Sequence, residues 1–239
     1  MSAARRLDVL SRFASAQGSD PNGARLCEVA AEVVDVTGAG VTLISQDTST
    51  STVCATDAVS ALVEELQFSL GEGPCLDAFR EDRPVVEPDL AHPATVRWMA
   101  FTPPALEAGV RSIFGFPLHI GAVRLGALDL YCDHTGALSD EQYGDALVVA
   151  DVVAASMATM QADAAPGSLS EQLGSRQDFR IAVHQAAGMV SVQLGVPIDE
   201  AVVRLRAHAF AVDLPVSEVA RRIVARQLRL DQPTDDATA

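Results

Sequence analysis

The sequence contains two apolar segments separated by a short turn, SIFGFPL at residues 112–118 and LGALDLY at residues 125–131. Runs of this length, rich in branched and aromatic residues, predict β-strands, and their close spacing predicts that they pair. A second pair lies upstream, GVTLIS at residues 40–45 and TSTVCA at residues 50–55, joined by a polar turn. The two pairs together predict an antiparallel sheet in the first two thirds of the chain.

Helical segments separate and follow these strand pairs. Apolar residues recur at helical spacing over residues 26–36, and shorter helices are predicted at residues 59–66, 76–80 and 104–108. Ser139 and Gln142 form a capping-box pattern ahead of a last helix, which carries apolar residues from 147 to 153. This alternation predicts an α+β fold built on an antiparallel sheet.

Residues 20–160 resemble a GAF domain, and four features carry the likeness: the opening helix, GEGPC at 71–75, FPL at 116–118 and LGALDLY at 125–131. The resemblance implies a sensor of a small molecule or of redox state. It also implies a ligand pocket on the side of the sheet that bears Cys75, with Cys75, Trp98 and Phe116 as candidate lining residues. It names neither the ligand nor a cofactor, and the missing Asn-Lys-Phe-Asp signature of cyclic-nucleotide GAF domains argues against cyclic GMP.

Each candidate functional residue of the GAF-like segment also has a possible role that is only structural. Cys75 is either a redox or attachment thiol or a small buried residue. Trp98 either stacks on a flat ligand or packs in the core, and His119 is either a haem ligand or a hydrogen-bonded surface residue. The sequence shows no paired acid and base, no nucleophile with an orienting partner and no phosphate-binding loop, so we expect no enzyme.

The four cysteines are scattered, with no CxxC pair: Cys27, Cys54, Cys75 and Cys132. This spacing argues against a structural zinc site and against a disulfide framework, and it is typical of a protein in the reducing cytoplasm. No run of about 18 apolar residues occurs, and no apolar core follows Arg5 and Arg6. We therefore expect a cytoplasmic protein with neither a membrane span nor a secretory signal.

Charge is distributed unevenly around a net value of −15, and all seventeen basic residues are arginines. Residues 1–171 hold nine arginines against twenty-four carboxylates, whereas residues 172–230 hold eight against five, which gives +3. The last nine residues add three aspartates. Such asymmetry indicates a polyanion-binding segment attached to a different domain, although so small a surplus requires a local and shaped contact.

The back of the chain predicts three helices, beginning near residues 170, 197 and 215. Gly195 is a stop signal for the first, and Pro197 and Pro215 open the second and third. The predicted apolar side of the first helix comprises Leu173, Phe179, Ala182, Val183, Ala186, Met189 and Val190. That of the second comprises Ala201, Val202, Leu205, Ala209 and Phe210, and that of the third comprises Val216, Val219, Ala220, Ile223, Val224 and Leu228.

Residues 175–229 resemble an ANTAR domain, the RNA-binding module of transcription antiterminators. The likeness is carried by QAAGM at 185–189, by Glu200-Ala201 with Leu205-Arg206 and Ala209, and by Val219-Ala220 with Ile223-Val224. The family commonly has lysine where this chain has Ala187. The expected RNA contacts are Arg180, His184, Gln185, Ala187, Gly188, Arg206, Arg221, Arg222 and Arg226. The alternative is that the small residues serve only helix packing and that the arginines form a solvated face.

These observations predict a sensor domain at residues 7–161, a linker at 162–169, an RNA-binding module at 170–230 and an acidic disordered tail at 231–239. The leading hypothesis is a signal-responsive regulator that binds hairpin loops in a leader transcript and acts by antitermination. Two loops read by two modules favour a homodimer. The alternatives are a DNA-binding regulator of helix-turn-helix type, and a GAF-type thiol reductase in which Cys54 resolves Cys75.

Overall fold

The computed structural model describes residues 3–19, 24–44, 50–163, 178–212 and 214–230. It divides into two compact units, residues 1–46 with 50–174 and residues 47–49 with 175–239, and each unit is described by itself. Most of the predicted linker, the predicted first turns of the back module and the acidic tail lie outside the described residues. The tail comprises residues 231–239. Leu173, which was predicted on the apolar side of the first helix of the back module, also lies outside the described residues.

The first unit is built on a five-stranded antiparallel sheet with strand order β2-β1-β5-β4-β3. Both predicted hairpins are present, namely β1 (Gly38–Ile44) with β2 (Thr50–Ala55) and β4 (Ser112–Ile120) with β5 (Val123–Cys132). Pairing of β1 with β5 joins the two hairpins. The edge strand β3 (Val85–Glu87) is missed by sequence reasoning, because three residues within a Pro- and Asp-rich stretch give no periodic signal.

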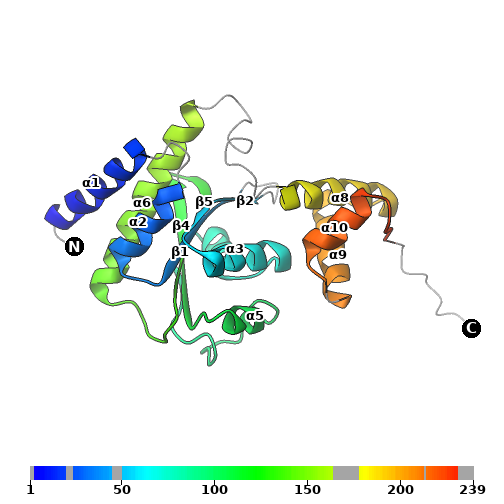
Figure 1. Cartoon of the computed structure of the whole chain (residues 1–239), viewed down its shortest axis with the longest axis horizontal. Helices are drawn as coiled ribbons and strands as arrows, with labels where there is room; N and C mark the ends of the chain where they lie inside the picture. Colours follow the sequence, from blue (N-terminus) through cyan, green and yellow to red (C-terminus); the bar gives the residue numbers. More distant parts are fainter. Residues whose placement is uncertain (1–2, 20–23, 45–49, 164–177, 213, 231–239) are drawn as a thin grey trace, which may run out of the picture. The chain divides into compact units, whose positions relative to one another are not determined.

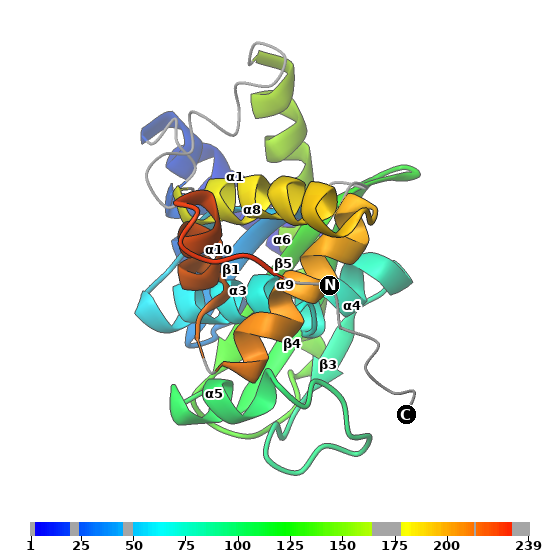
Figure 2. The same cartoon turned by 90° about the vertical axis from the view of Figure 1, so that its right-hand side faces the viewer.

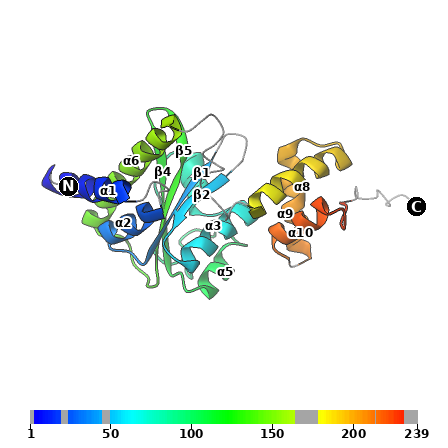
Figure 3. The same cartoon turned by 45° about the horizontal axis from the view of Figure 1, so that its top comes forward.

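Helices cover both faces of this sheet (Figure 3). On one face lie α2 (Ala24–Val34) and α6 (Asp140–Asp163), and α1 (Ala3–Ser19) packs against both. On the other face lie α3 (Ala58–Leu70), α4 (Pro74–Glu81) and α5 (Thr102–Glu107). The alternation of side chains along β5 assigns Leu128 and Leu130 to the α2/α6 face, and Asp129 and Tyr131 to the α3/α4 face.

The first helix, α1, is not predicted from the sequence. Val9 and Phe13, four residues apart on one side of α1, are fully buried in the core formed by α2, α6 and the sheet. Arg5 adds an ion pair with the buried Asp145 of α6, at 2.7 Å between Nη2 and Oδ2. These contacts make α1 part of the first unit.

Cys27 and Cys54 form a disulfide, so the expectation that the scattered cysteines form none is wrong. The residues are 27 apart in sequence, but α2 packs on β2 and brings their Cα atoms to 5.9 Å. Spacing along the chain does not reveal this proximity, because it depends on tertiary packing. Cys75 and Cys132 are buried and are not part of this disulfide.

The described residues of the second unit form three helices, α8 (Asp178–Leu194), α9 (Ile198–Ala211) and α10 (Val216–Val224), with α8 packed against both others (Figures 1 and 2). Gly195 follows α8 in the left-handed region, at φ 66°, and the two prolines directly precede α9 and α10 as predicted. One packing prediction is wrong: Phe210, expected inward, is 71% exposed. It lies near the end of α9, one residue past the buried Ala209.

Helix length and composition also bear on membrane association. Among the described residues, no single helix has the length and apolar composition needed to cross a membrane. Residues Ala182–Leu194 of α8 and α9, taken together, have the required length and apolar composition. The two helices are bent by 103° at the break between them.

Candidate functional site

The corner between α3 and α4 positions a set of polar side chains against the sheet. Gly71 ends α3 at φ 72°, and Gly73 precedes α4 at φ 136°, a value that side-chain-bearing residues rarely adopt. A Cβ atom on Gly73 would lie 2.5 Å from Oε1 of Gln67. The same Oε1 accepts a hydrogen bond from the backbone N–H of Cys75, at 2.7 Å. The glycines of the GEGPC segment therefore let Cys75 sit beside the last turns of α3.

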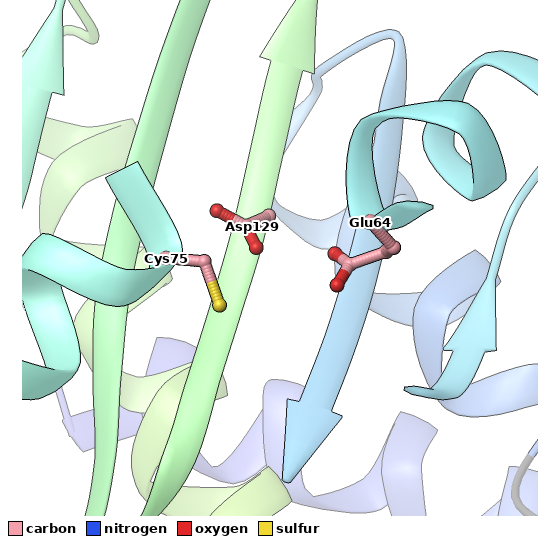
Figure 4. A group of neighbouring side chains, drawn as sticks. All are labelled: Glu64, Cys75 and Asp129. Atoms are coloured by element: carbon pink, nitrogen blue, oxygen red, sulfur yellow. The ribbon is translucent and has the colours of Figure 1, made fainter. Parts of the chain in front are cut away.

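Glu64 of α3, Cys75 of α4 and Asp129 of β5 meet over the sheet (Figure 4). One oxygen of each carboxyl group and the Cys75 Sγ all lie within 4.8 Å of one another, and each residue is at most 3% exposed. Gln67 Nε2 donates to Asp129 Oδ2 at 3.1 Å, and Thr42 of β1 donates to Glu64 Oε2. We call these five residues the buried polar cluster.

The sheet backbone is shaped to receive Glu64. Gly40 of β1 pairs with Asp129 of β5, so it lies directly beside the cluster. A Cβ atom at residue 40 would come within 2.2 Å of Glu64 Oε1. Glycine at this position therefore allows the Glu64 carboxyl to lie close over the sheet.

Ionising both of two buried carboxyl groups that lie this close together costs much free energy. Burial raises the pKa of the Asp129 carboxyl well above its usual 3.8, and the adjacent Glu64 carboxyl raises it further. Hydrogen bonds from Gln67 and Cys75 oppose the rise without cancelling it. Asp129 Oδ1 is buried and has no hydrogen-bond partner. The pair therefore holds a proton to a higher pH than an isolated carboxyl group does.

The structure places the three predicted pocket residues differently. Cys75 is in the cluster. Trp98 is 6% exposed and donates from Nε1 to Asp77 Oδ2 at 2.8 Å, which matches its core-packing alternative. Phe116 was expected in the pocket, and this is wrong: its side chain is fully buried on the α2/α6 face, where it contacts Tyr143. The alternation of β4 turns Phe116 away from Cys75.

Sequence reasoning missed four cluster members: Thr42, Glu64, Gln67 and Asp129. Asp129 carried a usable signal, because a carboxylate within the apolar segment LGALDLY must be buried with the strand. Period-two alternation then places it on the same face as Ala127 and Tyr131. The partners on α3 gave no comparable signal, because polar residues in an amphipathic helix ordinarily face solvent.

The predicted RNA-contact arginines are partly exposed on the second unit. Arg221, Arg222 and Arg226 are exposed, whereas Arg206 of α9 is half-buried. Glu218 pairs with both Arg221, at 3.1 Å, and Arg222, at 3.0 Å. The expected outward direction of the α10 arginines is therefore confirmed, although two of them share one carboxylate.

The predicted contacts on α8 divide between the surface and the core. His184 and Gln185 are exposed and Gly188 is half-buried, whereas nothing is described of the Arg180 side chain. The prediction that Ala187 contacts RNA is wrong, because Ala187 is fully buried. It falls on the same side of α8 as Val183 and Val190, four and three residues away, and that side packs inward.

Solved structures share the fold of the first unit. The GAF domain of a phosphoenolpyruvate-protein phosphotransferase from Coxiella burnetii has a TM-score of 0.51 at 18% identity, covering 68% of this chain and 98% of its own. Its counterpart from Acinetobacter has a TM-score of 0.51 at 14% identity, with the same coverage. Free methionine-R-sulfoxide reductase from Neisseria meningitidis has a TM-score of 0.50 at 17% identity, covering 69% and 96%.

At these identities the structural similarities establish the fold alone. No curated protein matches the sequence. The model of the GAF domain family, however, matches residues 23–156, which is more than half of the chain. The match includes the sheet, α3, α4 and every member of the buried polar cluster. The chain belongs to the GAF domain family.

Proposed function

We propose that this chain is a signal-responsive, RNA-binding regulator of transcription, in which the GAF domain senses a small ligand and residues 178–230 bind RNA. The observation that carries the sensory half is the buried polar cluster. Two adjacent carboxyl groups buried under two helices are costly to stability, and such groups concentrate at functional sites. Family membership supports sensing of a small molecule or another signal as the role of this domain.

The RNA half rests on the likeness of residues 175–229 to ANTAR domains and on two groups of side chains that are at least partly exposed. The first is the arginine set of α10, comprising Arg221, Arg222 and the following Arg226. The second is the pair Arg206 and Phe210, which are four residues apart and therefore share one side of α9. A guanidinium beside an exposed aromatic ring suits unpaired bases in an RNA loop, which are read by stacking and by phosphate contacts. Antitermination and a homodimer belong to the same proposal.

A gel-shift titration tests the RNA half directly. The full chain is titrated against a two-hairpin RNA and a duplex DNA of equal length, each at two salt concentrations. We expect the RNA to be preferred. Equal or tighter binding to the duplex would contradict the proposal and favour a DNA-binding regulator of helix-turn-helix type.

Charge variants sharpen this test. R221A/R222A is expected to weaken RNA binding and to reduce the slope of log K against log salt by about 1 to 2, since each lost phosphate contact removes released counterions. R12A/R83A, which removes two partly exposed arginines of the first unit, is the charge-matched control. Glu218→Gln is expected to strengthen binding, because it frees Arg221 and Arg222 from the carboxylate that holds them. An unchanged salt slope in R221A/R222A removes α10 from the contact surface.

A thiol reductase is the alternative from a different class, and the position of Cys75 beside two carboxyl groups is its motivation. The resolving partner considered for it was Cys54, which is bonded to Cys27 in this structure. The remaining thiol, Cys132, faces the α2/α6 core on the other side of the sheet. Reduction of free methionine sulfoxide that is lost in Cys75→Ser, with RNA binding intact, would favour the reductase.

A further inference from the structure

Two buried carboxyl groups of the first unit have different neighbours. Asp145 is 1% exposed and is bridged by Arg5, whose Nε and Nη2 lie 3.0 Å and 2.7 Å from Oδ2. Asp129 is 3% exposed, and its neighbours in the buried polar cluster are the Glu64 carboxyl, the Cys75 thiol and the Gln67 amide. Two carboxyl oxygens and a thiol sulfur therefore meet in one buried place, and together they are the ligands of a cation site.

We propose that Glu64, Cys75 and Asp129 bind a divalent transition-metal ion of the zinc type. This inference rests on the proposed function for its biological meaning, since it names the class of ligand that the GAF domain senses. The binding itself depends only on the geometry of the cluster. Asp129 Oδ1 is buried and has no hydrogen-bond partner among the described residues, so its lone pairs are available to a metal ion.

The spacing of the three groups suits such an ion. Zn²⁺ bonds of about 2.3 Å to sulfur and 2.0–2.2 Å to oxygen place tetrahedral ligand atoms about 3.3 to 3.7 Å apart. The three candidate atoms lie within 4.8 Å of one another, so closure on an ion needs shifts of about 1 Å. Three protein ligands leave a fourth position open, which is the arrangement of a site that exchanges a ligand.

The surrounding hydrogen bonds orient the ligands as in known metal sites, where outer partners hold the coordinating groups. Thr42 donates to Glu64 Oε2 and so holds the carboxyl group in place. Gln67 donates to Asp129 Oδ2 and accepts from the Cys75 backbone, so one amide fixes two ligands. Cys75 also lies in the first turn of the eight-residue α4, where the helix dipole favours a thiolate.

The donor set selects the class of metal. Mg²⁺ and Ca²⁺ require oxygen ligands and do not use a thiolate, so they fit poorly here. One sulfur with two carboxylate oxygens suits Zn²⁺ and its spectroscopic substitute Co²⁺. The net charge of three deprotonated ligands is −3, and a divalent ion reduces it to −1.

The test uses the full chain, freed of metal by a chelator and desalted, with Co²⁺ and Zn²⁺ as probes. Co²⁺ is expected to produce a thiolate-to-metal charge-transfer band in the near ultraviolet at one ion per chain. Zn²⁺ is expected to displace the Co²⁺ and to raise the melting temperature. Cys75→Ser should abolish the band, and Asp129→Asn should weaken Zn²⁺ binding by at least a hundredfold. Gln67→Ala, which removes an orienting partner, should weaken it about 10- to 100-fold.

Cys132→Ser is the matched control, because it removes a buried thiol on the opposite face of the sheet and should keep the band. A band that persists in Cys75→Ser, or no stoichiometric uptake by the folded wild type, would overturn the metal site. Circular dichroism of each metal-free variant establishes that loss of binding is not loss of folding. RNA binding is measured on the same samples. Failure of RNA binding with an intact Co²⁺ band refutes the proposed function alone, and the reverse result refutes the metal site alone.

Discussion

The two faces of the sheet differ in the groups that surround their buried carboxyl groups. On the α2/α6 face the core is almost wholly apolar, and its buried carboxylate, Asp145, is neutralised by Arg5 from α1. On the α3/α4 face the apolar clusters are interrupted by five buried polar side chains, and the two carboxyl groups among them face each other. The carboxylate on the first face has an arginine partner within the fold, whereas the two adjacent carboxyl groups on the second face gain stability from a proton or a bound cation.

This difference separates scaffold from site. A substitution on the α2/α6 face should change stability and leave ligand binding alone. A substitution in the buried polar cluster should change ligand binding and can even increase the stability of the unliganded protein.

Phe116→Ala should destabilise the first unit by about 3 to 5 kcal/mol, since it empties a fully buried aromatic site. Denaturant unfolding measures the loss. The fraction that remains folded should bind Co²⁺ as tightly as the wild type does, because Phe116 lies across the sheet from Cys75. Weakening of more than tenfold in the folded protein would mean that the two faces are not independent.

Removal of the Cys27–Cys54 disulfide should cost about 3 to 4 kcal/mol, the value expected for a loop of this length. Thermal unfolding of the wild type with and without reductant measures this cost, and C27A/C54A should not respond to reductant. Cys132→Ser is again the control, because it leaves the bridge intact. A wild-type melting temperature that is indifferent to reductant would contradict the paired state.

Much of the fold follows from local pattern. Both hairpins, the capping box at Ser139 and the three helices of the back module are predicted from periodicity, turn residues and caps. The capping box forms both expected hydrogen bonds, at 3.0 Å and 3.2 Å. What the pattern misses depends on tertiary contact. The short edge strand β3 has no period to detect, and α1 is stabilised by burial of Val9 and Phe13 and by the distant Asp145.

The site is less predictable than the fold, because it is assembled from four elements. Cys75 was found from a short motif, whereas Glu64, Gln67 and Asp129 depend on which helix face meets which strand face. The error at Phe116 has the same origin. The FPL motif suggested a position near Cys75, but the alternation of side chains along β4 directs Phe116 to the opposite face of the sheet. The errors at Ala187 and Phe210 came from assigning helix faces without knowing how α8 and α9 pack.

Asp129→Asn should stabilise the metal-free first unit at pH 7, by about 1 to 4 kcal/mol, because it replaces one of two adjacent buried carboxyl groups whose ionisation burial opposes. Burial and Glu64 raise the folded pKa of Asp129 above its usual 3.8. The wild type therefore loses stability as the pH rises from 3.8 through the folded pKa. The advantage of the variant should then be largest at neutral pH and vanish below pH 3.8. Unfolding in the presence of chelator at several pH values measures it, and a destabilised variant at pH 7 would contradict a costly ionisation of the buried pair.

Asp57→Ala should cost about 1 kcal/mol, the usual effect of losing a helix N-cap. Asp57 accepts from the Ser60 backbone N–H at 2.7 Å, and Tyr131 Oη donates to its other oxygen at 2.8 Å, which ties α3 to β5. Burial alone would raise the pKa of Asp57, but the hydrogen bonds from Ser60 and Tyr131 outweigh it and lower the pKa below 3.8. The contribution of the carboxylate is therefore present above pH 3.8 and lost as the pH falls through the folded pKa.

The pH dependence of Asp57→Ala should thus run opposite to that of Asp129→Asn, on the same face of the same sheet. The difference in unfolding free energy between wild type and Asp57→Ala should be constant at neutral pH and shrink in acid. Because Asp57 sets the start of the helix that carries Glu64 and Gln67, the variant should also weaken Zn²⁺ binding, by less than tenfold. A larger loss of Zn²⁺ affinity than Gln67→Ala causes would mean that the position of α3, and not its polar side chains, determines the site.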